Sequence, residues 1–197
     1  MPTSIISICN MALAWIGTNR IAALTENSPG AQICSQFYDP ARLQTLRDHQ
    51  WNFAQSRATL ALVDVPAEYP EYAYAYAWPD KCVRAHKVYL NGNDYDFTVV
   101  LGPDGASRMI LTNTPDAVLS FTADVSDPTL FDPLYARALA RRLAADAGTV
   151  IFKHNPQKMQ ELETYYLNEV RKAQAKDAEE GTPDNDTEIP WITARTI

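Results

Sequence analysis

The side chains best placed to do chemistry in this sequence are carboxylates, because acids recur in close pairs. Asp94 and Asp96 form one pair, and Glu161 and Glu163 form another. Two carboxylates that flank a glycosidic bond can serve as general acid and as base or nucleophile. Acids are also the usual solvated groups of a protein surface, and close spacing alone is typical of that role. We therefore interpret both pairs as surface acids and keep glycan hydrolysis as the alternative function.

The rest of the sequence contains no pattern that predicts a cofactor, a metal ion or an activated nucleophile. Its histidines stand apart, with no second histidine or cysteine at a ligand spacing: His49, His86 and His154. With seven glycines it has no phosphate-binding loop, and it has no Gly-x-Ser-x-Gly elbow. Its three cysteines are widely spaced and odd in number, which is typical of reduced, buried residues from an intracellular folding environment: Cys9, Cys34 and Cys82. We expect no enzymatic activity, no cofactor and no metal site.

Arginines and aromatic residues form two further clusters. Arg137, Arg141 and Arg142 share an expected helix and form a basic patch. It could face a neighbouring subunit or a DNA backbone, but pairing with acids of the following helix, such as Glu161 or Glu169, is the simpler interpretation.

The aromatic cluster has the two-residue period of a strand. Its bulky members alternate with alanines: Tyr72, Tyr74, Tyr76 and Trp78. Such a stripe can stack on sugars or bases, but it more commonly packs into a core, and we expect the core.

Charge divides the chain into a body and a tail. The 197 residues include 24 acids and 17 bases, for a net charge of −7. Six of the acids fall between Asp177 and Glu188. Without these six, 18 acids remain against the 17 bases of the whole chain, so the body is nearly neutral. A neutral body excludes the basic excess typical of sequence-specific nucleic-acid binding. The length fits one domain, or a core with one insertion.

The tail, residues 177–197, is predicted to be an extended acidic arm that ends in a docking peptide. An acidic stretch cannot bury enough apolar surface to fold alone. The apolar peptide that follows the acidic stretch would be exposed to solvent on an extended arm. We therefore expect this peptide to dock on another chain, with docking on the body of the same chain as the alternative. The docking residues are Ile189, Pro190, Trp191, Ile192, Ala194 and Arg195.

The body is predicted to be an α+β fold: an antiparallel helix bundle with an inserted β-rich region, 56–125. Apolar spacing and capping residues predict helices at 3–17, 29–50, 133–151 and 156–176. Pro40 either kinks the second helix or begins a new one capped by Asp39. Strands are expected at 72–78, 83–90, 95–101, 108–112 and 117–123, with turns at Asn91-Gly92 and Gly102-Pro103-Asp104-Gly105. No signal peptide or membrane span is expected.

Several motifs, taken in order along the chain, resemble the tail tubular protein A family of bacteriophage head-to-tail adaptors. They are Ile8-Cys9-Asn10-Met11-Ala12-Leu13, Phe37-Tyr38-Asp39-Pro40-Ala41-Arg42, Trp51-Asn52-Phe53-Ala54, Pro79-Asp80-Lys81-Cys82, Phe131-Asp132-Pro133 and Pro190-Trp191-Ile192. The match covers nearly the whole chain and is weakest over residues 85–125. Its structural signature consists of Asp39, Pro40, Arg42, Trp51, Asn52 and Phe53.

The resemblance implies a structural role in the virion. Such adaptors assemble in the host bacterial cytoplasm as a ring, usually a dodecamer, between the portal protein and a nozzle or tail protein. DNA passes through the ring without sequence-specific binding, and no membrane is involved. In related adaptors a C-terminal arm attaches to the portal. The alternatives are a tail-associated glycan or peptidoglycan hydrolase and a nucleic-acid-binding module that uses the arginine patch.

Overall fold

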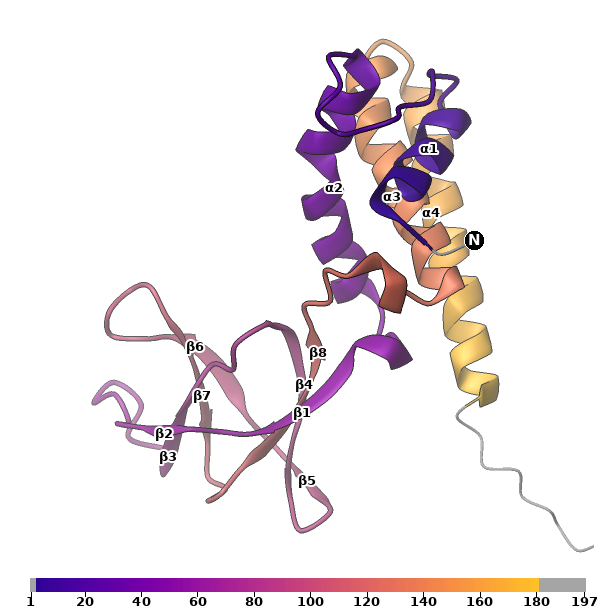
Figure 1. Ribbon diagram of the computed structural model, residues 1–197. Helices are drawn as coiled ribbons and strands as arrows, with labels where there is room; N and C mark the ends of the chain where they lie inside the picture. Colours follow the sequence, from indigo (N-terminus) through magenta and orange to yellow (C-terminus); the bar gives the residue numbers. More distant parts are fainter. Residues whose placement is uncertain (1–2, 181–197) are drawn as a thin grey trace, which may run out of the picture.

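The computed structural model describes the backbone of residues 3–180 and the side chains of residues 3–176. The docking peptide, Ile189 to Arg195, lies outside the described residues. The described chain forms two lobes, a helical bundle and a β-lobe inserted between α2 and α3 (Figure 1). This confirms the predicted α+β fold, with helices before and after an inserted β-rich region.

The bundle consists of α1 (Ile5–Trp15), α2 (Pro29–Asp48), α3 (Pro133–Ile151) and α4 (Pro156–Glu180). Side-chain caps fix the helix starts, because each satisfies a backbone N–H that the first turn leaves unpaired. Ser4 forms a capping box with Ser7. Ser28, Asp132 and Asn155 each accept a backbone hydrogen bond, and each is followed by a proline at the first helical position.

Helix α3 lies at the centre of the bundle and packs against α1, α2 and α4. Its buried face is rich in alanine, which allows close approach. Gly148 marks the closest point, because a Cβ there would lie 2.6 Å from Cδ1 of Leu162 on α4. An apolar stripe on α4 faces this contact: Leu162, Tyr166, Val170 and Ala173 are buried, and Met159 is half-buried.

The β-lobe consists of two four-stranded antiparallel sheets, in the orders β1-β8-β4-β5 and β2-β3-β7-β6. The strands are β1 (Gln55–Thr59), β2 (Leu62–Val63), β3 (Tyr74–Ala77), β4 (Cys82–Leu90), β5 (Asn93–Tyr95), β6 (Thr98–Leu101), β7 (Arg108–Thr112) and β8 (Val118–Ala123). The first and last strands pair with each other, with Gln55 opposite Thr122. The chain therefore enters and leaves the lobe side by side, next to the bundle (Figure 1).

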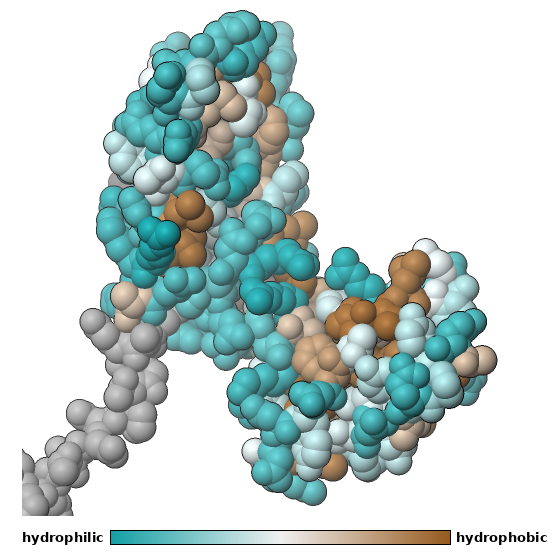
Figure 2. Space-filling view, turned by 180° about the vertical axis from the view of Figure 1, so that it is seen from behind, coloured by the Kyte–Doolittle hydropathy of each residue, from teal (hydrophilic) through white to brown (hydrophobic). Residues whose placement is uncertain are grey.

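Side chains between the two sheets form the core of the β-lobe. Tyr76, Ile110 and Leu119 belong to this cluster, while the neighbours Ala75 and Leu111 point to the opposite face. That outer face is covered by residues of the segment 63–72. Of the aromatic stripe, which was expected in the core, Tyr76 is fully buried and its hydroxyl donates to the Thr114 carbonyl at 2.9 Å. Tyr72, Tyr74 and Trp78 are half-buried. Figure 2 shows hydrophobic residues that also reach the surface of this lobe.

The structure corrects several predicted boundaries. Helix α2 runs through Pro40 without a new start. The expected strand 95–101 is two strands, β5 and β6, which belong to different sheets. Helix α4 extends to Glu180, four residues into the range assigned to the arm.

The turn at Asn91-Gly92 is confirmed, with both φ angles positive, at 52° and 83°, as a two-residue hairpin requires. Within residues 3–180, no helix is long and apolar enough to cross a membrane.

Candidate functional site: the junction between the two lobes

Arg42 joins the two lobes through a buried network. Its guanidinium forms an ion pair with Asp124, just past β8, and donates to the Val125 carbonyl at 3.0 Å. Its Nε donates to Asp39 at 3.2 Å, one turn back on α2. The side chain is only 7% exposed, so its charge needs these partners. Burial acts to lower the pKa of Arg42, but the hydrogen bonds with Asp124 and Asp39 outweigh it and raise the pKa above its usual value.

Trp51 and Phe53 form the second part of the junction, where α2 has ended and β1 is about to begin. Trp51 is buried, and its indole N–H donates to the Thr45 carbonyl at 2.7 Å. Both rings pack on Tyr135 of α3, with centroid distances of 5.1 Å for Trp51 and 4.9 Å for Phe53. Aromatic rings at these separations and tilts attract each other beyond simple burial. Both residues therefore fix the segment that leads into β1 against α3.

Tyr135 connects these two parts. Its ring contacts Trp51 and Phe53, and its hydroxyl donates to the Arg42 carbonyl at 3.1 Å. Burial raises the pKa of Tyr135, which keeps the hydroxyl in the donating form. Sequence reasoning missed both Tyr135 and Asp124, since neither belongs to a motif that marks it as a partner of Arg42.

Two hydrogen bonds from arginine side chains to backbone carbonyls add to the junction at the end of α2. Arg47 donates to the Val83 carbonyl at 2.9 Å, and Arg84 donates to the Arg47 carbonyl at 2.8 Å. These bonds tie the end of α2 to the start of β4. The β-lobe is therefore held through both β8 and β4, which restricts its orientation relative to the bundle.

The six signature residues have different positions in this junction. Arg42, Trp51 and Phe53 pack inward, and Asp39 reaches the network through Arg42. Pro40 and Asn52 are exposed. Asn52 accepts a hydrogen bond from Gln55 at 3.1 Å, which supports the short turn between the helix and β1.

The predicted basic patch is divided among three environments. Arg137 pairs with Glu169 of α4 at 3.2 Å, as the simpler interpretation predicted. Arg142 pairs with Asp146 and with Glu163, not with Glu161. Two of the three arginines therefore have an acidic partner within the chain.

Arg141 makes no ion pair among the described residues. Its guanidinium carbon lies 3.7 Å from the ring centroid of Trp15 and 4.9 Å from that of Tyr165. Its Nε is buried without a hydrogen-bond partner in the described part of the chain.

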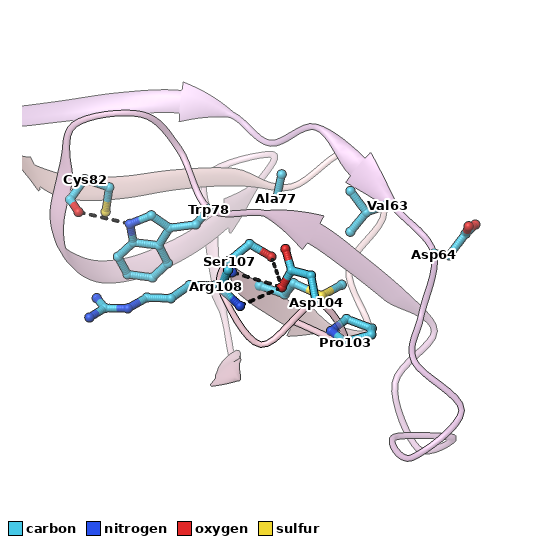
Figure 3. A pocket seen from close by; sticks show the side chains of 11 residues that line it. Val63, Asp64, Ala77, Trp78, Cys82, Pro103, Asp104, Ser107 and Arg108 are labelled. Atoms are coloured by element: carbon cyan, nitrogen blue, oxygen red, sulfur yellow. Dashed lines mark hydrogen bonds between the residues drawn. The ribbon is translucent and has the colours of Figure 1, made fainter. Parts of the chain in front are cut away.

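A separate hollow of about 800 Å³ lies in the β-lobe, between the ends of β2 and β3 and the β6–β7 turn (Figure 3). Trp78 forms one wall, with the Arg108 guanidinium 5.4 Å from its ring centroid. Asp104 accepts hydrogen bonds from Ala106 and Ser107, and the backbone N–H of Ser107 is the main cause of its lowered pKa. Burial raises the pKa of the Cys82 thiol to about 12. The hollow therefore offers an ionised acid committed to a turn and a protonated thiol, neither of which is prepared for catalysis.

Three of the four acids considered for hydrolysis are also engaged elsewhere. Asp94 pairs with exposed Lys87, and Glu163 pairs with Arg142. Glu161 accepts from the Tyr165 hydroxyl at 2.8 Å and also pairs with Lys158. Tyr165 is the main cause of the lowered Glu161 pKa, whereas a general acid needs a raised one. Among the described residues, no group of three histidines, cysteines or acids is placed to hold a metal ion.

Comparison with protein-family models finds no match for this chain, and comparison with curated proteins finds none either.

Proposed function

We propose that this chain is a structural head-to-tail adaptor of a tailed bacteriophage, not an enzyme. It forms a ring between portal and tail that surrounds the DNA exit channel. The observation that carries the proposal is the position of the signature residues. Arg42, Trp51 and Phe53 carry part of the sequence resemblance, and they meet at one junction with Tyr135.

A junction of this kind suits a ring component. Each subunit of a ring must present one surface to the next subunit and another to the preceding one, at a fixed angle. A β-lobe held to its bundle by Arg42, Arg47 and Arg84 keeps that angle constant. Large apolar side chains remain exposed at the edges of one sheet, with Leu62 on β2 64% exposed and Leu101 on β6 62% exposed. Such residues are suited to contact neighbouring subunits.

The electrostatics agree with passage of DNA. A channel that releases a genome needs few lasting phosphate contacts, because each neutralised phosphate adds to affinity. The body is nearly neutral, and Arg137 and Arg142 are paired with acids of the same chain. The C-terminal segment that follows α4 would attach the ring to the portal.

Sedimentation of the purified chain with and without portal protein tests this function. We expect a monomer or weak oligomer alone and a closed ring on the portal. Deletion of residues 181–197 should leave a folded body that no longer joins the portal. Trp191→Ala should weaken attachment by at least about 2 kcal/mol, the size of an interface hot spot. A stable two-fold dimer that ignores the portal, or undiminished portal binding by the truncated chain, would contradict the proposal.

A further inference from the structure

The outward side of α1 carries a shallow groove made of two adjoining hollows, of about 410 and 360 Å³. The hollows share Ser7, Met11 and Trp15, so the thioether and the indole form a common floor. The first hollow extends to Arg20, beyond the end of α1, and the second extends to Arg137 on α3. Figure 1 shows α1 on one face of the bundle, where it packs against α3.

The groove has an excess of positive charge. Arg20 makes no ion pair among the described residues, and no acid lines either hollow. Arg137 is 54% exposed, and its partner Glu169 also pairs with Lys172, so one carboxylate serves two cations. Arg141 lies over the Trp15 ring with its Nε unpartnered. An apolar floor between arginines fits a peptide that combines acids with an aromatic residue.

We propose that residues 181–197 of the same chain occupy this groove in the free protein. The sequence of this segment has the matching chemistry. Asp184, Asp186 and Glu188 precede Ile189-Pro190-Trp191-Ile192. The acids complement Arg20 and Arg137, and Trp191 covers the floor of Met11 and Trp15, since sulfur and aromatic rings are favourable partners for an indole.

The length of the segment allows intramolecular docking. Glu169 holds Arg137 at the edge of the groove, and α4 ends eleven residues later at Glu180, about 16 Å further along the helix axis. Trp191 follows Glu180 by eleven residues, which span up to roughly 36 Å when extended. The chain can therefore turn back to the groove with length to spare. Tethering also gives the segment an effective concentration on the order of millimolar, which favours its own groove over that of a second copy.

This inference goes beyond the adaptor function and stands without it. A groove that holds the C-terminal segment in the free chain competes with any partner that binds the same segment. The segment then becomes available only where a partner binds it more tightly than the groove does.

Fluorescence anisotropy with a fluorescein-labelled synthetic peptide of residues 181–197 tests the proposal. The probe is titrated with the full-length chain and with its Trp191→Ala variant. We expect the variant to bind the probe at least about fivefold more tightly, because its own segment has lost its anchor and leaves the groove open. Arg20→Glu, introduced into the Trp191→Ala chain, should weaken probe binding at least about tenfold. Arg171→Glu, an exposed arginine of α4, is the matched control and should leave binding unchanged.

Three outcomes would overturn the proposal. In the first outcome, the probe would bind neither chain, or would bind both equally, which would mean that the segment does not occupy the groove. In the second outcome, sedimentation would show that the wild-type chain associates with itself and that Trp191→Ala abolishes the association. The segment would then bind to a second copy of the chain. In the third outcome, a labelled single-stranded 12-nucleotide DNA would displace the probe in a salt-dependent manner, and Arg20→Glu would abolish binding of this DNA. The groove would then be a site for phosphate groups. Thermal unfolding of each variant confirms that it is folded, and none of these measurements involves the portal.

Discussion

Arg42 on α2 and Asp124 after β8 form an ion pair that joins two segments 82 residues apart in the sequence. Because β8 is the strand by which the chain leaves the β-lobe, this pair attaches the exit of the insertion to the helix that precedes it. The arginine is buried and the aspartate is about one-third exposed. The pair therefore contributes to the arrangement of the lobes as well as to stability.

Removing the carboxylate should destabilise the protein. In Asp124→Ala, Arg42 keeps Asp39 and the Val125 carbonyl but loses its closest counter-charge while remaining buried. We expect a decrease of about 2 kcal/mol in the free energy of unfolding, below the roughly 3–5 kcal/mol of a fully buried pair, because Asp124 is partly solvated. Urea unfolding measures it. Asp94→Ala, which removes an ion pair between two exposed side chains, is the control and should change stability by less than about 1 kcal/mol. Equal effects of the two substitutions would show that the junction pair has no special role.

Trp51→Ala should destabilise the fold by roughly 3–5 kcal/mol, since the indole is 2% exposed and its removal leaves a large cavity beside Tyr135. Trp51→Phe should cost less, because a ring remains but the hydrogen bond to the Thr45 carbonyl is lost. Thermal unfolding distinguishes the two. Tyr95→Ala, at an exposed aromatic position, should leave the melting temperature nearly unchanged. A normal melting temperature for Trp51→Ala would mean that this tryptophan is a surface contact instead.

Tyr38→Phe should stabilise the protein by about 1 kcal/mol. The Tyr38 hydroxyl is buried without a hydrogen-bond partner among the described residues, and an unsatisfied buried hydroxyl is costly. Tyr135→Phe is the matched control: it removes a hydroxyl that donates to the Arg42 carbonyl and should destabilise the protein. If Tyr38→Phe destabilises the protein as Tyr135→Phe does, the Tyr38 hydroxyl forms a hydrogen bond and the prediction is wrong.

The same tyrosine predicts an alkaline dependence. Burial raises the pKa of Tyr38 from about 10 in the unfolded chain to about 12 in the folded one. Between these values the unfolded chain loses its proton first, so the free energy of unfolding falls as pH rises through this range. Below pH 10 Tyr38 is protonated in both states, so its titration does not lower the free energy of unfolding there. Tyr38→Phe should make the decrease between pH 10 and 12 shallower, as urea unfolding at several pH values would measure. An unchanged slope would contradict the assignment.

Gly148→Ala tests the contact between α3 and α4. Alanine favours a helix by about 1 kcal/mol over glycine. The new Cβ, however, would lie 2.6 Å from Cδ1 of buried Leu162, and overpacking costs roughly 1–3 kcal/mol. We expect net destabilisation in the wild-type background. In a Leu162→Ala background the clash disappears, and Gly148→Ala should become stabilising. A double-mutant cycle by urea unfolding measures this reversal of sign, and its absence would show that the helices separate easily here.

The sequence by itself predicted much of the secondary structure, because the signals involved are local. Pairs such as Asp132-Pro133 and Asn155-Pro156 set helix starts through a capping side chain and a fixed proline φ angle, both within one turn. The turn Asn91-Gly92 likewise depends on residues that accept positive φ. Helix α3 accordingly has the bounds expected for it, 133–151.

Local sequence signals predicted the wrong boundaries where long-range packing determines the secondary structure. The segment 95–101 is rich in aromatic and β-branched residues, but β5 pairs with β4 and β6 pairs with β7 in the other sheet, so the chain divides at residues 96–97. Pro40 disfavours a helix, but α2 continues through it with Ala41 and Arg42 buried on its inner face. Tertiary contacts there outweigh a loss of roughly 3 kcal/mol in helix propensity.

The candidate site shows the same division. The sequence marked Arg42, Trp51 and Phe53 as members of a signature, but it could not assign Asp124 or Tyr135 to them, because a partner 82 or 93 residues away leaves no local spacing. From the sequence, Arg137, Arg141 and Arg142 were grouped as one patch, because they lie within six residues of each other on one expected helix. Only the packing of α3 against α1 and α4 decided that Arg137 meets Glu169 and that Arg141 meets the Trp15 ring. Charge and composition are properties of the chain, whereas the burial and pairing that give each charge its role arise when distant segments come into contact.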